Sequence, residues 1–235
     1  MSAYACEPNR GSEPEVGWQW CRQMARFHDV TVVTRANNRE VIETALAGQR
    51  SSRPGFVYYD LPRWLVAAKR RGLPVAIYYA LWQIGVRRFL AHRLREFDLI
   101  HHVTFNSFRQ PGFWWNRNPP VVLGPLGGGQ VCPWQFVVTF GRRFIPEVTR
   151  SLSVWGSRWL PHLHASFRAA RLILVANQDT ARRIPPRYGA KTRSLLETGI
   201  PRELTEVSSQ RAEVRIRPLT SDLRLRRMDS CTSSG

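Results

Sequence analysis

Short apolar runs rich in β-branched residues alternate with longer amphipathic stretches over most of the chain. The short runs are typical of buried strands, and the longer stretches, with apolar positions three and four residues apart, are typical of helices. We expect strands at Val30–Thr34, Phe56–Asp60, Leu99–Thr104, Val121–Gly124, Leu172–Ala176 and Ser194–Glu197. We expect helices at Pro14–His28, Arg39–Ala47, Val75–Glu96, Phe136–Val148 and Ser153–Ala170. This alternation predicts an α/β fold in which helices cover both faces of a parallel sheet.

The pattern is incomplete at both ends. Only Ser2–Ala5 precede the first turn, so most of a first strand is expected to be missing. The periodicity ends after Pro201, and residues 211–235 mix arginine, leucine, serine and threonine without an apolar face. Such a segment buries too little apolar surface to order itself. We therefore expect one domain over residues 1–201 and, over residues 202–235, either a natural disordered tail or the product of a shifted reading frame.

Composition and charge exclude few classes of protein. A chain of 235 residues with 43% hydrophobic content can bury a substantial core. Its four cysteines lack C-x-x-C spacing, so neither a zinc site nor a disulfide framework is indicated, and a reducing cytoplasm fits best. The formal net charge of +18 attracts polyanions in general, whether nucleic acid, an anionic membrane or phosphorylated small molecules. Because arginine supplies nearly all of this charge, a GC-rich coding sequence explains it equally well.

The sequence contains no apolar run long enough for a transmembrane helix. The longest uncharged apolar stretch, Gly72–Val86, contains Pro74 and is shorter than the roughly 20 residues that a spanning helix needs. The region Trp64–Phe97 mixes aromatic side chains with arginine and lysine, which suits a helix lying at a membrane surface. It suits equally an ordinary helix that packs on the core and leaves a basic face in water.

The segment Glu7–Glu15 is the first candidate for ligand binding. Ser12 and Glu15 have the spacing of a capping box, and Pro14 is tolerated in a first helical turn, so a helix is expected to begin here. Gly11 then directly precedes a helix N-terminus, where backbone N–H groups and the helix dipole favour an anion. The alternative is a capped helix after a turn, without a ligand.

A run of glycines is the second candidate. Gly127, Gly128 and Gly129 follow the predicted strand at residues 121–124. Consecutive glycines cost backbone entropy, and ligands of open α/β sheets bind at the carboxyl ends of strands. The pattern matches neither a P-loop nor G-x-G-x-x-G, and a flexible connector is the alternative.

The adjacent histidines His101 and His102 are the third candidate. They lie in the predicted strand at residues 99–104, where neighbouring side chains face opposite sides of the sheet. At most one of them can therefore point into a given cleft, where an imidazole can donate to a substrate oxygen near neutral pH. The alternative is a purely structural histidine.

In this order and with this spacing, the three features resemble the N-terminal domain of the family 4 glycosyltransferases. The matching segments are Ser2-Ala3-Tyr4-Ala5-Cys6-Glu7-Pro8, Gly11-Ser12-Glu13-Pro14, Gly17-Trp18, Asp98-Leu99-Ile100-His101-His102-Val103-Thr104-Phe105, Gly124-Pro125-Leu126-Gly127-Gly128-Gly129, Ala176-Asn177-Gln178-Asp179-Thr180 and Glu197-Thr198-Gly199-Ile200. The last two resemble that domain's closing strand and the crossing into a second domain. The resemblance covers about residues 2–201.

The resemblance implies a GT-B architecture, in which two Rossmann-like domains face each other across a cleft and this chain supplies the first. It implies a metal-independent, retaining transfer of a sugar from a nucleotide sugar, without a cofactor, to a cell-surface polysaccharide or lipid-linked glycan. The residues that match the loop near the donor diphosphate and sugar are Gly11, Ser12 and Glu13. The residues that match the reacting centre and the acceptor side are His101 or His102, and Gly127, Gly128 and Gly129.

Part of the family's machinery has no counterpart here. The second domain of the family carries a Glu-x7-Glu pair and the basic residues that neutralise the departing diphosphate. Glu7 and Glu15 have that spacing, but they lie in a proline-interrupted loop at the other end of the chain, so we interpret it as coincidence. Electrostatic stabilisation of the leaving group usually supplies a large share of the rate enhancement in such transfers. The chain alone is therefore expected to be inactive or nearly so.

Two other functions remain open at the sequence level. The first is a non-catalytic domain whose basic, tryptophan-rich surface binds an anionic membrane or a glycan, which would place the protein at the inner face of the membrane rather than free in the cytoplasm. The second is nucleic-acid binding, which rests on charge alone. No helix-turn-helix, RNP-type or zinc motif supports it, so no nucleic-acid partner is expected.

Overall fold

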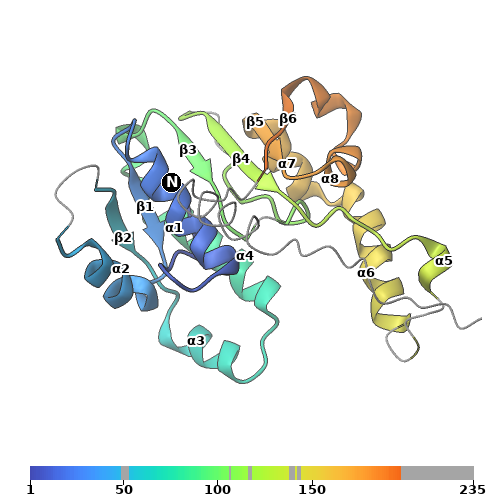
Figure 1. Ribbon diagram of the computed structural model, residues 1–235, viewed down its shortest axis with the longest axis horizontal. Helices are drawn as coiled ribbons and strands as arrows, with labels where there is room; N and C mark the ends of the chain where they lie inside the picture. Colours follow the sequence, from blue (N-terminus) through green and yellow to red (C-terminus); the bar gives the residue numbers. More distant parts are fainter. Residues whose placement is uncertain (49–52, 106, 116–117, 138–140, 142–143, 197–235) are drawn as a thin grey trace, which may run out of the picture. The chain divides into compact units, whose positions relative to one another are not determined.

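Parallel strands form the centre of the fold. The computed structural model describes residues 1–196, except for 49–52, 106, 116–117, 138–140 and 142–143. The strands are β1 (Thr31–Thr34), β2 (Gly55–Tyr58), β3 (Ile100–His102), β4 (Val121–Leu126), β5 (Ala170–Val175) and β6 (Thr192–Ser194). β1 pairs with β2, and β3, β4, β5 and β6 pair in that order, all in parallel (Figure 1). The predicted Rossmann-like α/β class is confirmed.

Residues 1–3 join the two groups of strands. Ser2 bridges in parallel both to Val33 of β1 and to His102 of β3. The backbone hydrogen bonds follow this pattern, because Ser2 N donates to the His101 carbonyl at 2.8 Å and Ala3 N donates to the Val33 carbonyl at 3.0 Å. The strand order is therefore β2, β1, residues 1–3, β3, β4, β5, β6. The short segment at the start of the chain occupies the central position, which the sequence pattern did not assign.

Helices connect the strands and cover the sheet. The α-helices are α1 (Ser12–Met24), α2 (Arg39–Leu46), α3 (Arg63–Arg70), α4 (Val75–Phe89), α5 (Trp134–Val137), α6 (Phe144–Gly156), α7 (Pro161–Ala169) and α8 (Gln178–Arg183). The short 3-10 helices are η1 (Ala36–Asn38), η2 (Leu94–Glu96), η4 (Ser157–Trp159) and η5 (Pro186–Lys191). The sequence analysis did not predict α3 and α8 as separate helices.

The helices expected at Pro14–His28 and Arg39–Ala47 correspond to α1 and α2, and the other three predicted helices differ more strongly from the structure. The helix expected to run from Val75 to Glu96 ends at Phe89, and a turn and η2 complete the span. The helix expected at Phe136–Val148 is replaced by α5 and the start of α6. The helix expected at Ser153–Ala170 is divided into the end of α6, η4 and α7, because the extended Leu160 breaks the helix and proline is accommodated in the first turn of α7.

The sheet is covered on both faces. On one face, α1 and α2 bury a cluster that contains Cys6, Trp18, Cys21, Val32 and Ile42. On the other face, α4 and α7 bury a larger cluster that contains Tyr4, Tyr79, Trp82, Leu123 and Phe167. The aromatic residues Tyr78, Tyr79 and Trp82 of α4 are buried in this core. The membrane-surface interpretation of the region Trp64–Phe97 stays a prediction.

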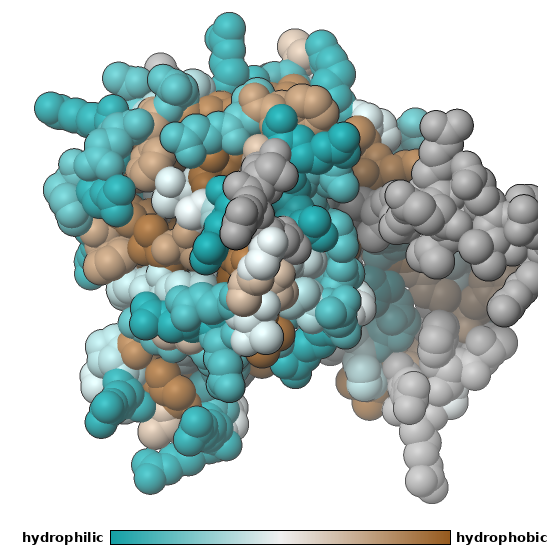
Figure 2. Space-filling view, turned by 60° about the vertical axis from the view of Figure 1, so that its left-hand side comes forward, coloured by the Kyte–Doolittle hydropathy of each residue, from teal (hydrophilic) through white to brown (hydrophobic). Residues whose placement is uncertain are grey.

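Hydrophilic side chains dominate the face of the molecule drawn in Figure 2, with hydrophobic ones in small groups between them. Within the described residues, no helix is both long and apolar enough to cross a bilayer.

Candidate functional site

The candidate residues lie at or just beyond the carboxyl edge of the sheet, at the ends of the central strand, β3 and β4 or in the segments that follow them. The chain runs from residues 1–3 outward to β1 and β2, and then changes direction to continue with β3 on the opposite side. Such a switch of direction separates the loops that follow the two neighbouring strands, and ligands of open α/β sheets bind in the crevice between them. Here those loops are the segment before α1 and the segment after β3, with the glycine loop after β4 next to them.

The loop before α1 brings Gly11 to the helix N-terminus, as expected, but by a different local geometry. Gly11 is the N-cap residue with φ of 65°, and Ser12 is the first helical residue with φ of 53°. The predicted capping box is wrong, since no side chain caps the helix at this position. Glu15 instead accepts a hydrogen bond from the backbone N–H of Asn9 at 2.6 Å, so its carboxylate holds the loop that precedes the helix.

The buried carboxylate of Glu7 holds the same loop through two ion pairs. Glu7 is 5% exposed and pairs with Arg10 at 2.5 Å and with Arg35 at 3.5 Å. The Arg35 guanidinium lies 4.6 Å from the centre of the Tyr4 ring, and its Nε donates to the Tyr4 carbonyl at 3.2 Å. Arg35 follows β1, so this contact joins the carboxyl ends of two adjacent strands. Nothing in the local sequence pattern pointed to Arg35.

His101 and His102 face opposite sides of the sheet, as predicted for neighbours on a strand. His101 is 8% exposed, packs edge to face against Trp20 of α1, and bonds through Nε2 to the Gly124 carbonyl at 2.8 Å. Because a carbonyl only accepts, this nitrogen carries the proton. Burial lowers the pKa of His101 to about 4, so the ring is neutral at physiological pH. The catalytic role expected for the histidines stays a prediction.

His102 lies in a fully buried network on the α4 side. Its Nε2 is 2.8 Å from the Tyr79 hydroxyl, and its Nδ1 is 3.2 Å from the Ser2 hydroxyl. The Tyr79 hydroxyl donates to the Thr104 carbonyl at 2.9 Å, so His102 Nε2 donates to Tyr79 and Nδ1 accepts from Ser2. Burial lowers the pKa of His102 to about 3. This ring therefore binds the central strand to β3 and α4, which is a positioning role.

Thr104 connects the two sides of the switch point. Its hydroxyl accepts a hydrogen bond from the backbone N–H of Ala5 at 3.1 Å. Its methyl group lies 2.8 Å from the place that a Cβ atom on Gly17 of α1 would occupy. The threonine belongs to the segment after β3, so it holds that segment against the strand that leads to Gly11. Residues of this kind escape sequence analysis, because a buried threonine has no distinctive spacing.

The glycine loop after β4 is anchored to both of its neighbours. Gly127 accepts a hydrogen bond from the Phe108 N–H at 3.0 Å, and Gly129 N donates to the Thr180 hydroxyl at 3.1 Å. A Cβ atom on Gly129 would lie 2.5 Å from Thr180 Cα, so only glycine allows this approach. Gly128 is exposed and has φ of 77°. These contacts argue against the flexible-connector alternative.

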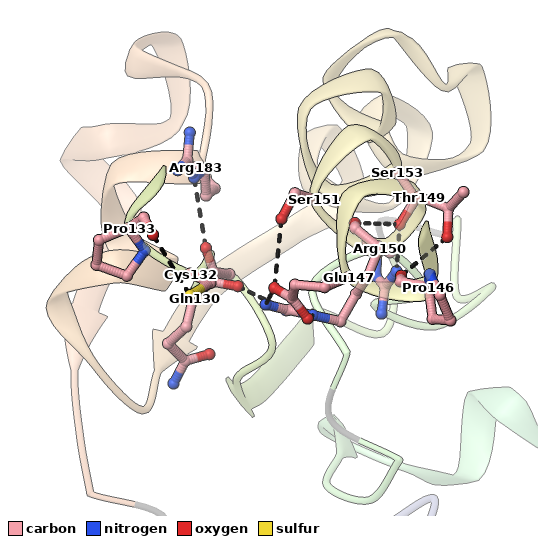
Figure 3. A network of polar contacts seen from close by, with 12 residues as sticks. Gln130, Cys132, Pro133, Pro146, Glu147, Thr149, Arg150, Ser151, Ser153 and Arg183 are labelled. Carbon is pink, nitrogen blue, oxygen red and sulfur yellow. Dashed lines mark hydrogen bonds and ion pairs between the residues drawn. The ribbon is translucent and has the colours of Figure 1, made fainter. Parts of the chain in front are cut away.

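The glycine loop also holds a helix beyond it, as Figure 3 shows. Arg150 of α6 donates to the Gln130 carbonyl at 2.8 Å and pairs with Glu147 one turn earlier. The pKa of Glu147 is lowered, chiefly by its hydrogen bond with Arg150. On the other side, Arg183 of α8 donates to the Gly129 carbonyl at 3.4 Å. The loop is thus held between two arginines, neither of which the sequence marked.

Two hollows in the described part of the chain lie away from these loops. A small one of about 30 Å³ lies near the start of β1 and β3, at the amino edge of the sheet. A larger open one of about 470 Å³ lies between α4 and Trp115, and Arg87 and Arg88 line it. The candidate site is an open edge rather than either of these hollows. No group of three or more potential metal ligands occurs among the described residues.

Comparisons of the chain with protein-family models, with curated proteins and with solved structures found no match.

Proposed function

We propose that residues 1–201 are the N-terminal, acceptor-side domain of a retaining glycosyltransferase with GT-B architecture, as the resemblance to family 4 implies. One observation carries the proposal. The three segments of the resemblance, far apart in the sequence, come to the carboxyl edge of one parallel sheet, on both sides of its switch point. That edge is where open α/β sheets bind their ligands. The reaction would move a sugar from a nucleotide sugar to a polysaccharide or lipid-linked glycan.

The loop before α1 has the properties that a donor diphosphate and sugar require. The first N–H groups of a helix have no partner within the helix, and the helix dipole favours an anion there. The space around the Gly11 Cα is open, with no atom within 4 Å of a Cβ position. A phosphate oxygen can therefore approach the backbone of Gly11 and Ser12. The carboxylate of Glu13, in the first turn, is suited to accept hydrogen bonds from sugar hydroxyls.

In this proposal the glycine loop forms the acceptor side of the cleft. The two histidines contribute by holding in place the segments to which they hydrogen-bond. Gly128 exposes its backbone, while Gly127 and Gly129 keep the loop in place. His101 fixes the Gly124 carbonyl at the base of this loop. The groups that neutralise the leaving diphosphate would come from a second domain, so the chain alone is expected to bind without transfer. We propose a cytoplasmic protein that works at the inner face of a membrane.

The binding part of the proposal can be tested on the chain itself by NMR of 15N-labelled protein. UDP-glucose and GDP-mannose are titrated separately, with inorganic phosphate as the control. We expect one nucleotide sugar to shift the amide signals of Gly11, Ser12 and Gly128 more than phosphate does. The variant Gly128→Val should weaken this response, and Gly156→Ala, at a helical glycine with open space around it, should not. Equal shifts with phosphate, or no shift with any nucleotide sugar, would overturn the proposal.

The architectural part has an independent test in the genomic DNA. We expect the sequence downstream of the Pro201 codon, read in all frames, to encode a second Rossmann-like domain with a Glu-x7-Glu pair. An intact stop codon in well-covered sequence, with no such continuation, would count against the GT-B assignment.

A further inference from the structure

Helix α6 turns its apolar face to the outside. Phe144, Ile145, Leu152 and Trp155 are 45%, 70%, 63% and 53% exposed. At 100° per residue they fall on one side of the helix, because they lie at relative positions 0, 1, 8 and 11. Trp159, in η4 directly after α6, is 75% exposed. We call this set, Phe144, Ile145, Leu152, Trp155 and Trp159, the α6 apolar face.

The opposite side of α6 makes the contacts with the rest of the domain. Arg150 bonds to the Gln130 carbonyl, and Ser153 accepts a hydrogen bond from Arg109 at 2.6 Å. Val154 is 1% exposed and belongs to the core cluster. A surface helix normally buries its apolar stripe and exposes its polar one. In α6 the arrangement is reversed for most of the apolar side chains, so packing against the described part of the domain does not explain the exposed face.

The chemistry around the α6 apolar face favours an anionic lipid surface as its occupant. The charged residues of α6 and η4 are two arginines and one acidic residue: Arg150, Arg158 and Glu147. The guanidinium of Arg183 lies 4.4 Å from the Trp155 ring centre, and that of Arg158 lies 5.2 Å from the Trp159 ring centre. Tryptophan and arginine beside an apolar helix face are characteristic of interfacial helices. A second copy of this chain also carries a net charge of +18, so two copies would repel each other electrostatically.

We infer that the α6 apolar face docks on an anionic bilayer and so places the glycine loop at the membrane surface. Arg183 connects the two features directly, since it contacts both the Gly129 carbonyl and the Trp155 ring. In α6, Arg150 makes a second connection through the Gln130 carbonyl (Figure 3). The docking itself does not depend on the proposed function, because it involves only the α6 apolar face. The consequence that the acceptor is a lipid-linked glycan, rather than a free polysaccharide, rests on the proposed function.

The test is co-sedimentation of the full chain with vesicles of phosphatidylcholine alone and of phosphatidylcholine mixed with phosphatidylglycerol. We expect binding to the mixed vesicles only. The variant Ile145→Gln/Leu152→Gln removes two exposed apolar side chains without changing charge, and it should weaken binding by about tenfold or more. Trp159→Gln should weaken binding several-fold. The matched control is Trp64→Gln in α3, since Trp64 is 70% exposed, and it should bind like the wild type.

Each other outcome overturns the inference. Equal binding to both vesicle types would show that no anionic surface is recognised. Wild-type binding by the α6 double variant, or an equal loss in Trp64→Gln, would remove α6 as the docking surface. If sedimentation velocity shows a wild-type dimer that the double variant abolishes while vesicle binding is unchanged, the occupant is a second copy. Because these assays contain no sugar donor, their failure leaves the NMR test of nucleotide-sugar binding untouched.

Discussion

The carbonyl oxygen of Ala5 lies 2.1 Å from the point that a Cβ atom on Gly17 would occupy. The backbone of α1 therefore rests directly on the end of the central strand, one turn after the loop that contains Gly11. Ala5 is held in turn by Thr104, which accepts a hydrogen bond from its N–H. This close approach fixes the position of the α1 N-terminus relative to the carboxyl edge of the sheet.

Replacing Gly17 by alanine should destabilise the domain. The new methyl group would overlap the Ala5 carbonyl and crowd Thr104, and backbone atoms cannot rotate away. Overpacking of this kind costs about 1–3 kcal/mol in the free energy of unfolding. The measurement is urea unfolding followed by circular dichroism. Gly156→Ala is the control, because Gly156 has helical dihedral angles and open space around its Cβ position. Equal midpoints for the two variants would contradict the close approach.

Tyr79→Phe tests the buried network that joins α4 to the switch point. The change keeps the ring but leaves His102 Nε2 and the Thr104 carbonyl without their shared partner. Unsatisfied buried polar groups of this kind cost about 1–3 kcal/mol. Tyr58→Phe, at a partly exposed ring in β2, should change stability by less than about 0.5 kcal/mol. Urea unfolding of both variants under the same conditions makes the comparison, and a neutral Tyr79→Phe would show that the network is not formed.

Much of the fold could be predicted from the sequence, because strands and helices of a parallel α/β sheet have distinct periods. The runs at Val30–Thr34 and Val121–Gly124 were placed within two residues of their ends in the structure. The central strand could not be placed from the pattern, since Met1–Ala3 are too few to show alternation and their pairing depends on β1 and β3. The predicted tail at residues 202–235 and the crossing at Gly199-Ile200-Pro201 lie outside the described residues.

The candidate site was predicted less completely than the fold. Glycines are conspicuous in a sequence, and Gly11, Gly127, Gly128 and Gly129 do lie at the edge where ligands of this architecture bind. The residues that hold these glycines are common types without a motif, such as Thr104, Thr180 and Arg183, and only the three-dimensional structure brings them there. The exposure of the α6 apolar face was missed for a related reason. Periodicity shows that a helix has an apolar side, but it does not show which way that side turns.

The two buried histidines predict a loss of stability in mild acid. Burial lowers the pKa values of His101 and His102 to about 4 and about 3, against 6.5 in a solvated chain. The unfolded state therefore binds more protons as the pH falls below about 6.5, so stability is complete above that pH and is lost as the pH falls towards about 4. We expect a loss on the order of 2 kcal/mol for each histidine between about pH 7 and pH 5.

Urea unfolding at several pH values checks this dependence. His101→Gln keeps a donor near the Gly124 carbonyl and removes one titrating ring, so the profile should become about half as steep. His92→Gln, at an exposed histidine, is the matched substitution for comparison. A wild-type profile in His101→Gln would mean that His101 is not the source of the acid sensitivity.

The two arginines that pair with Glu7 should contribute very different amounts of stability. The side chain of Arg10 is 66% exposed, whereas that of Arg35 is 18% exposed and also contacts the Tyr4 ring and carbonyl. Exposed ion pairs contribute about 0–1 kcal/mol. Loss of Arg35 leaves the buried Glu7 carboxylate with the exposed Arg10 as its remaining ion-pair partner among the described residues and also removes the contacts with Tyr4, so Arg35→Met should cost about 2–3 kcal/mol and Arg10→Met less than about 1 kcal/mol.

A double-mutant cycle isolates the ion pair from the packing of the Arg35 side chain. Glu7→Gln removes the charge that Arg35 balances, so Arg35→Met should cost less in that background than in the wild type. The remaining cost should reflect the contact with Tyr4, which does not depend on Glu7. If Arg35→Met costs the same in both backgrounds, Arg35 stabilises the loop before α1 through Tyr4 alone. Equal costs for Arg10→Met and Arg35→Met would contradict the difference in burial on which this prediction depends.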